Sequence, residues 1–149
     1  MASARKTDSD LINPLESHVG YQLRRASTLV MAALADRLST TNLTVTEASV
    51  LVMIHHNPGV SQSAIGRSLG VKRANMAPII ATLDDRGLVH RSNPNGRVIS
   101  LSATEAGRQC ADTVEATMRA NDMEMLGTLK PESQRDLLDW LTAIRRARA

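Results

Sequence analysis

The chain has 149 residues, of which 42% are hydrophobic, and this length suits one ordinary domain rather than two. Tyr21 and Trp140 are the only aromatic residues, so the core must be built from aliphatic side chains and methionine. No apolar run approaches the roughly 20 residues of a membrane-spanning helix, and the first ten residues lack the apolar stretch of a secretory signal. The single cysteine, Cys110, excludes an internal disulfide and a cysteine-rich zinc site. We therefore expect a cytoplasmic protein with no membrane partner.

The net charge of +3 is concentrated in one part of the chain. Residues 61–101 hold six basic and two acidic side chains, an excess of four positive charges, whereas the rest of the chain holds 12 basic and 13 acidic ones. A basic segment on a nearly neutral scaffold favours a surface that binds a polyanion. On charge alone, an ordinary solvated face remains the alternative.

The first half of the sequence predicts four helices. Asn13 and Pro14 open a helix over residues 14–39, in which apolar residues recur at steps of three and four. A capping box at Thr44 opens a second helix, which ends before an Asn-Pro-Gly turn. Two shorter helices follow, from Gln62 to Leu69 and from Arg73 to Arg86, and each is closed by a glycine.

The period then changes to that of a β-hairpin. Residues 88–91 and 97–101 read as strands, and the Asn-Gly pair in the turn between them is a strong hairpin signal. A capping box from Ser102 to Glu105 opens a long helix, and Pro131 starts the last one. The expected fold class is mainly α with a small β-hairpin wing, in the order of four helices, two strands and two helices.

Residues 44–102 have the layout of a winged helix-turn-helix unit. The second of its two short helices fits the major groove of B-DNA, whose base edges carry a distinct pattern of donors and acceptors. The helix before it braces this recognition helix against the phosphates, and a hairpin tipped with arginine can reach the adjacent minor groove. We therefore expect double-stranded DNA as a partner.

Four ordered segments carry a family resemblance: Ser61-Gln62-Ser63-Ala64-Ile65-Gly66-Arg67-Ser68-Leu69-Gly70, Leu83-Asp84-Asp85-Arg86-Gly87-Leu88-Val89-His90-Arg91, Asn95-Gly96-Arg97 and Ala103-Thr104-Glu105-Ala106-Gly107. Together they resemble the MarR family of bacterial transcription regulators, and the resemblance covers roughly residues 14–147. It implies that residues 1–149 form a single MarR-type domain.

Three features depart from the family pattern. Asn95 stands where the family usually has an aspartate that positions the wing arginine, and the wing is short. Pro78 lies where the recognition helix should already be regular. Since proline is tolerated only in a first turn, either this helix starts late, near Ala74, or it kinks.

The resemblance implies a homodimer in which the terminal helices interlock, here residues 14–39 and 104–147. The sequence supports this independently, because three long amphipathic helices carry more apolar surface than a small winged unit can cover. A two-fold dimer would also match a palindromic operator. Packing within one chain is the alternative. The apolar residues of the last helix that need a partner are Leu137, Leu138, Trp140, Leu141 and Ile144.

The expected DNA-binding residues lie on both short helices and on the wing. Arg73 could pair with guanine and Asn75 with adenine, whereas in the simpler alternative Arg73 and Lys72 contact phosphates and Asn75 is a cap. Arg91 either holds the base of the wing or contacts DNA, and Arg97 is the favoured wing contact. The complete set is Ser61, Gln62, Ser63, Arg67, Lys72, Arg73, Asn75, Met76, Arg91, Asn95 and Arg97.

The resemblance also implies an effector site between the winged unit and the dimer helices. Two adjacent arginines beside a tyrosine, on a mostly aliphatic helix, would suit an anionic aromatic ligand. Alternatively, one arginine pairs with Asp36 or Glu16 of a neighbour and the tyrosine simply packs. The candidate effector-binding residues are Tyr21, Arg24, Arg25, Ser27, Met53, His55, His56 and Cys110.

The run from His18 to Ala26, with Asn75 and Pro78, resembles the MarR subgroup that controls phenylpropanoid catabolism. This implies a hydroxycinnamoyl-coenzyme A thioester as effector, whose phosphates would explain the paired arginines. The adjacent histidines 55 and 56 are a possible metal pair, but neighbouring helical residues point about 100° apart, which favours ordinary packing and no metal. Cys110 could be a redox switch, although a lone cysteine on an apolar helix face is more often core.

Three classes of function compete. Against an enzyme, the sequence has no GxSxG, no HExxH, no phosphate-binding loop and no Gly-rich dinucleotide turn, so no catalytic residue or cofactor is expected. The favoured hypothesis is a repressor that binds a palindromic operator as a homodimer and is released by a small anionic aromatic effector or its coenzyme A thioester. The alternatives are a protein-interaction module whose basic patch is incidental, or a redox-sensing regulator acting through Cys110.

Overall fold

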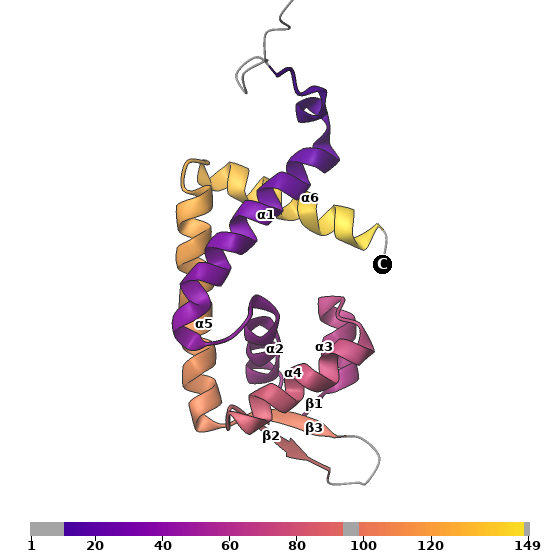
Figure 1. The fold of residues 1–149 in the computed structure, drawn as a ribbon, viewed down its shortest axis with the longest axis vertical. Coiled ribbons are helices and arrows are strands. Elements are labelled where there is room, and N and C mark those ends of the chain that lie inside the picture. The colour runs from indigo at the N-terminus through magenta and orange to yellow at the C-terminus, as the bar shows by residue number, and fades with distance from the viewer. Residues whose placement is uncertain (1–10, 94–98, 148–149) are drawn as a thin grey trace, which may run out of the picture.

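The computed structural model describes residues 11–93 and 99–147 and arranges them in two layers (Figure 1). One layer is a winged unit, and the other contains α1 and α6, while the long α5 packs against both α1 and α2. The helices are α1 Val19–Leu38, α2 Val45–His56, α3 Gln62–Leu69, α4 Arg73–Asp85, α5 Glu105–Leu126 and α6 Pro131–Arg146, and the strands are β1 Val60–Ser61, β2 Val89–Ser92 and β3 Ser100–Ala103. The predicted fold class is confirmed, with one strand more than expected.

The predicted helix over residues 14–39 is interrupted near its start. Residues Pro14–Ser17 form one 3₁₀ turn, in which the Leu15 amide donates to the side-chain oxygen of Asn13 (3.1 Å). His18 is extended (φ −94°, ψ 120°), and α1 begins after it without a side-chain cap. The cap at Asn13 is confirmed, but it opens a separate turn. The apolar spacing does not reveal a break of a single residue.

Local capping sets the boundaries of the winged unit. The box at Thr44 is complete, because the Glu47 amide donates to the Thr44 hydroxyl and the Thr44 amide donates to the Glu47 carboxylate (2.8 Å). Ser61 caps α3, and Gly70 closes it in the left-handed conformation at φ 67°. α4 begins at Arg73, as the sequence predicts, rather than later. Pro78 therefore falls in its second turn and leaves one carbonyl of the first turn without its amide donor.

The sheet is antiparallel, with the strand order β1-β3-β2. The sequence does not predict β1, because two residues are too few to show the alternation of a strand. The predicted capping box at Ser102 is wrong, because Ser102 lies in β3. Thr104 caps α5 instead, its hydroxyl accepting a hydrogen bond from the Gly107 amide (3.0 Å). A Cβ on Gly107 would lie 1.9 Å from the Leu88 carbonyl oxygen, so only glycine allows α5 to start this close to the sheet.

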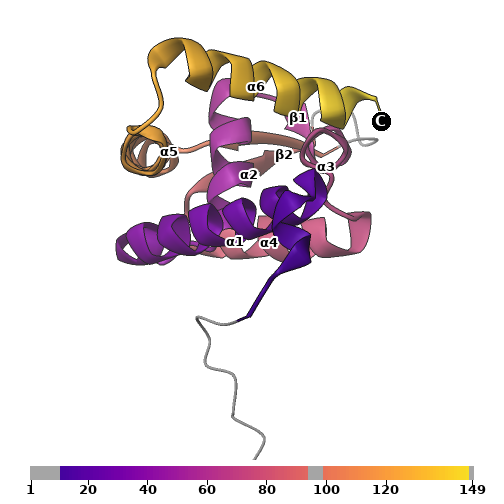
Figure 2. The same ribbon diagram turned by 90° about the horizontal axis from the view of Figure 1, so that it is seen from above.

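The hydrophobic core lies in the winged unit and at its contacts with α1 and α5. Its fully buried side chains include Leu38, Leu51, Ile54, Ile65, Ile80, Leu83, Leu101 and Val114. In contrast, α6, which is described in full, contains no buried residue. Figure 2 shows α1 and α6 running along opposite edges of the molecule, so neither helix covers the other. Among the described residues, no helix has the length and apolarity needed to cross a bilayer.

Candidate nucleic-acid interface and effector region

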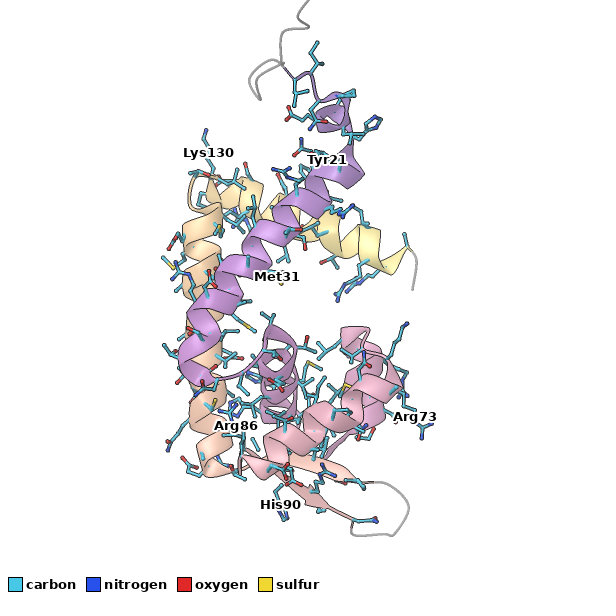
Figure 3. The ribbon with its side chains drawn as sticks, viewed as in Figure 1. Tyr21, Met31, Arg73, Arg86, His90 and Lys130 are labelled. Carbon is cyan, nitrogen blue, oxygen red and sulfur yellow. The ribbon has the colours of Figure 1, made fainter. Side chains whose placement is uncertain are left out.

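The corner between α3 and α4 brings several predicted DNA-binding residues together. Gln62, Ser63 and Arg67 from α3, with Lys72 and Arg73 at the start of α4, line one hollow of about 420 Å³. Arg73 is exposed and points away from the domain (Figure 3). The corner thus offers three cations and two polar side chains beside the N-termini of two helices, and these groups commonly bind phosphate.

Met76 also lines this hollow, but it is buried, which argues against its predicted contact with DNA. Its side chain is 1% exposed and packs against α3, where a Cβ on Gly66 would lie 3.1 Å from the Met76 Cγ atom. Met76, Ile80 and Leu83 form the buried face of α4. Met76 therefore fixes the rotation of α4 from inside the domain. Its place next to the basic residues in the sequence suggested exposure that the helix turn does not allow.

Asn75 and Ser61 have different local roles. Asn75 is exposed, and it is not a helix cap, because Lys72 occupies the capping position of α4. Asn75 borders a second hollow, of about 650 Å³, between α4 and the start of α2. The Ser61 hydroxyl accepts a hydrogen bond from the Ala64 amide (3.3 Å), so it acts as the cap of α3. The predicted wing residues Asn95 and Arg97 lie outside the described residues.

Two exposed arginines of the basic segment form polar contacts with other parts of the domain. The Arg91 guanidinium pairs with Asp84 (Nε–Oδ2, 2.9 Å), which ties the base of the wing to the end of α4 and favours the structural role for Arg91. Arg86 donates to the main-chain carbonyls of Thr41 and Asn42 (2.8 and 2.7 Å). It therefore ties the end of α4 to the turn that follows α1. Sequence reasoning missed this contact, because both carbonyls lie more than 40 positions away.

One part of the predicted effector site is a hollow of about 470 Å³ on α1, lined by Tyr21, Arg24, Arg25, Thr28 and Leu29. The Arg25 guanidinium carbon lies 5.9 Å from the centre of the Tyr21 ring, and Asn13 donates to the Tyr21 hydroxyl (3.0 Å). The ion pairs found among the described residues involve neither Arg24 nor Arg25. Ser27 is exposed but does not line this hollow.

The other candidates lie elsewhere, where α2 packs against α5. His56 and Glu115 approach to 2.5 Å, and His55 and Asp112 to 3.6 Å. The hydrogen bond with His56 holds the pKa of Glu115 below its usual value. Met53 is half-buried against the core. A single chain therefore divides the predicted effector residues into two separate groups rather than one site.

The structure bears on the metal and redox alternatives as well. Within residues 11–93 and 99–147, no three His, Cys, Asp or Glu side chains are placed to hold a metal ion. Cys110 is half-buried against the core. Burial raises the pKa of the Cys110 thiol, and the opposing effect of the Arg86 charge is smaller. Because the thiolate is the reactive form, this environment disfavours a redox switch at Cys110.

A helix-turn-helix corner that carries exposed cations, braced by a small sheet and flanked by long terminal helices, defines a winged-helix DNA-binding protein. Residues 43–97 match the MarR family. Over 123 residues, 81% of this chain and 88% of the relative, the sequence is 31% identical to the HTH-type transcriptional repressor Rv2887 of Mycobacterium tuberculosis. The chain therefore belongs to the MarR family. That family consists of transcriptional regulators rather than enzymes.

Solved structures extend the comparison. CouR from Rhodococcus jostii RHA1, bound to p-coumaroyl-CoA, is 27% identical, with a TM-score of 0.81 and coverage of 89% of this chain and 95% of that chain. Rv2887 is 28% identical in its complex with DNA (TM-score 0.72) and 29% in its complex with p-aminosalicylic acid (TM-score 0.70), each covering 86% of this chain and 98% of that chain. MarR regulators act as dimers, in agreement with the expected second copy.

Proposed function

We propose that the chain binds a palindromic operator as a homodimer and is released by a small anionic aromatic effector or its coenzyme A thioester. The cluster at the α3–α4 corner carries this proposal, because Arg67, Lys72 and Arg73 lie there beside Gln62 and Ser63. Contacts between these side chains and the phosphates of DNA would position α4 in the major groove. Two copies of α4 would then occupy successive turns of the duplex.

Base recognition is assigned to the flanks of α4 and to the wing. Arg73 reaches outward and could bind guanine O6 and N7, while Asn75 could bind adenine N6 and N7. Arg97, helped by Asn95, would contact the adjacent minor groove. The Arg91 side chain, which is paired with Asp84, would support the base of the wing rather than bind DNA.

The dimer is assigned to the terminal helices, residues 14–39 and 104–147. The apolar face of α6 is open in the single chain: Leu138, Trp140 and Ile144 are 65%, 64% and 53% exposed. Contiguous exposed apolar residues of this size mark an interface. A second copy that covers α6 would also complete the surroundings of the hollow on α1. The effector candidates on α2 and α5 would then either line the walls of that hollow or have a different role.

The effector class is supported by the hollow that holds Tyr21, Arg24 and Arg25. Two guanidinium groups beside an aromatic ring suit a ligand that combines an anionic group with a flat apolar part. Among the related structures, CouR is bound to p-coumaroyl-CoA and Rv2887 to p-aminosalicylic acid, and both ligands are anionic and aromatic. A coenzyme A thioester would also use both arginines, because its phosphates add negative charge.

Release of DNA requires that α1 and α4 move together. Arg86 supplies a direct connection, because it joins the end of α4 to the turn after α1 through two hydrogen bonds. An effector that binds α1 more tightly in a second spacing of the two α4 helices would favour that spacing. By linkage, it would weaken operator affinity by the same factor by which the operator weakens its own binding.

Fluorescence anisotropy on duplex DNA from the chain's own upstream region tests the proposal. We expect tight binding that survives scrambled competitor, falls steeply with salt and is weakened by p-coumaroyl- or feruloyl-coenzyme A. Arg73→Ala should weaken operator binding, whereas Arg24→Ala should preserve it and blunt the effector response. Specific binding that no thioester or aromatic acid releases would reject the effector. No specific binding at low salt would reject the operator function and favour a protein-interaction module.

A further inference from the structure

The outward face of α4 is small and apolar. Met76, Ile80 and Leu83 point into the core from one side of this helix. At about 100° per residue, the opposite side presents four residues without a polar group over residues 74–81, and the exposed Asp85 follows them at the end of the helix. Three of the four are exposed and Ala81 is half-buried; we call this set, Ala74, Ala77, Pro78 and Ala81, the α4 ridge.

The ridge limits what the centre of α4 can recognise. Arg73 and Asn75 lie on its two flanks, each turned about 100° from its middle. A helix that enters the major groove by this face can therefore form hydrogen bonds with base edges only along its sides. Along its centre, the complementary group is the C5 methyl of thymine, which is the apolar feature of the major-groove pattern.

Helix propensity alone does not account for the ridge. Exposed alanines suit any stable helix, but Pro78 does not, because proline removes an amide donor and is the poorest helix former. Pro78 also borders the hollow of about 650 Å³ that α4 shares with Thr46 of α2 and with Thr44, the cap of α2. Its ring therefore adds apolar surface on the open side of the helix. The small alanines beside it let the helix axis lie close to the floor of the groove.

We infer that the α4 ridge reads thymine methyl groups at the centre of each operator half-site. The inference rests on the proposed operator function and adds the base that the operator must supply. Each half-site should place A·T pairs under the middle of α4, between the pairs that Arg73 and Asn75 contact. The two-fold dimer makes this contact twice, once in each half-site.

Deoxyuridine tests the inference, because it keeps every hydrogen-bonding group of thymidine and lacks only the methyl. Footprinting on the upstream duplex first locates the operator. Two substituted duplexes are then compared with the parent, one carrying uracil at the protected thymines of the half-sites and one carrying it in the flanks. We expect about a threefold to fourfold loss of affinity for each contacted methyl, as for burial of one methylene, and no loss from the flanks.

Variants at one position of the ridge assign the contact. Serine and alanine are both better helix formers than proline, so both replacements of Pro78 should fold. Pro78→Ser should bring the ratio of thymine to uracil affinity close to one at the contacted position. Pro78→Ala should keep part of the preference for thymine. Ala106→Ser, on the exposed first turn of α5, is the matched control and should leave the ratio unchanged.

The outcomes separate this inference from the function on which it rests. Equal affinity for the thymine and uracil half-sites would overturn the α4 ridge while leaving operator binding intact. A thymine preference that Pro78→Ser and the Ala106→Ser control change equally would also overturn the assignment to the ridge. A duplex that gives no footprint would overturn both the inference and the operator function.

Discussion

The winged unit and the terminal helix α6 differ in how much of their apolar surface the chain itself covers. In the winged unit, Leu51 and Ile54 of α2 are fully buried against the other helices and the sheet. In α6, Trp140 is 64% exposed although its helix is amphipathic. A helix whose apolar face stays open gains its stability from a partner. The winged unit is therefore organised within one chain, and we propose that α6 is covered by a second copy.

Among the changes that test this difference between the two regions, shortening a buried core side chain should have the largest effect. Leu51→Ala should lower the free energy of unfolding by about 2–5 kcal/mol, because it leaves a cavity in a fully buried site. The matched variant Leu138→Ala lies on α6 and is 65% exposed in the single chain. Under dilute conditions in which the chain is monomeric, it should change stability by less than about 0.5 kcal/mol. Urea denaturation measures both, and equal losses would contradict the division into two regions.

The next largest effect is expected on association rather than on folding. Trp140→Ala should weaken the dimer by about 2 kcal/mol or more, as for a buried aromatic side chain at the centre of an interface. Asp139→Ala, one residue away on the polar side of α6, is the control. Sedimentation equilibrium reports both dissociation constants. A Trp140→Ala chain that remains as dimeric as the control would show that α6 does not form the interface.

Capping chemistry made most of the fold predictable, because it depends on neighbouring residues. Thr44 with Glu47, Ser61 and Gly70 each set a helix end where the sequence placed it. The failures have a different origin. The break at His18 and the two-residue β1 are too short to leave a periodic pattern. The cap of α5 depends on Ser102 being paired in a sheet, which is a tertiary fact.

The candidate site was predictable only where exposure follows from helix position. Gln62, Ser63 and Arg67 fall on one side of α3, and the structure gathers them with the start of α4. Met76 was misplaced because the rotation of α4 depends on what it packs against. The contact of Arg86 with carbonyls far along the chain has no local signature at all.

Arg86 provides a smaller test, because it joins the two regions. Arg86→Ala removes two hydrogen bonds from exposed carbonyls, and we expect a loss of about 1–2 kcal/mol in unfolding free energy. It should also reduce the effector-induced loss of operator affinity, if α1 acts on α4 through this contact. Arg108→Ala is the control, because its hydrogen bonds reach only Glu105 on its own helix and Ala103 at the end of β3. A full effector response in Arg86→Ala would show that Arg86 only stabilises the turn after α1 and does not transmit the effector signal.

The smallest expected effect concerns pH, at the contact between α2 and α5. The hydrogen bond with His56 lowers the pKa of Glu115 from its usual 4.5. A lowered pKa in the folded state means that the carboxylate stabilises the fold above the unfolded-state value, and that this contribution is lost as the pH falls through the folded-state value. The side chains of His56 and Glu115 are 56% and 25% exposed, so the contribution should stay below about 1 kcal/mol.

Urea midpoints measured from about pH 6 downward, past the usual pKa of 4.5, test this contribution, because the pKa of Glu115 in the folded chain lies below that value. Glu115→Gln should be less stable than the parent chain at the upper pH, and the difference should disappear toward the lower pH as the parent carboxylate is protonated. Glu132→Gln on α6 is the control, because Glu132 is 71% exposed and pairs with Arg135 of its own helix across 3.8 Å. Its difference from the parent should stay near zero throughout. A Glu115→Gln difference that does not vary with pH would mean that the lost contact is steric rather than electrostatic, and that α2 and α5 are held together by the apolar core alone.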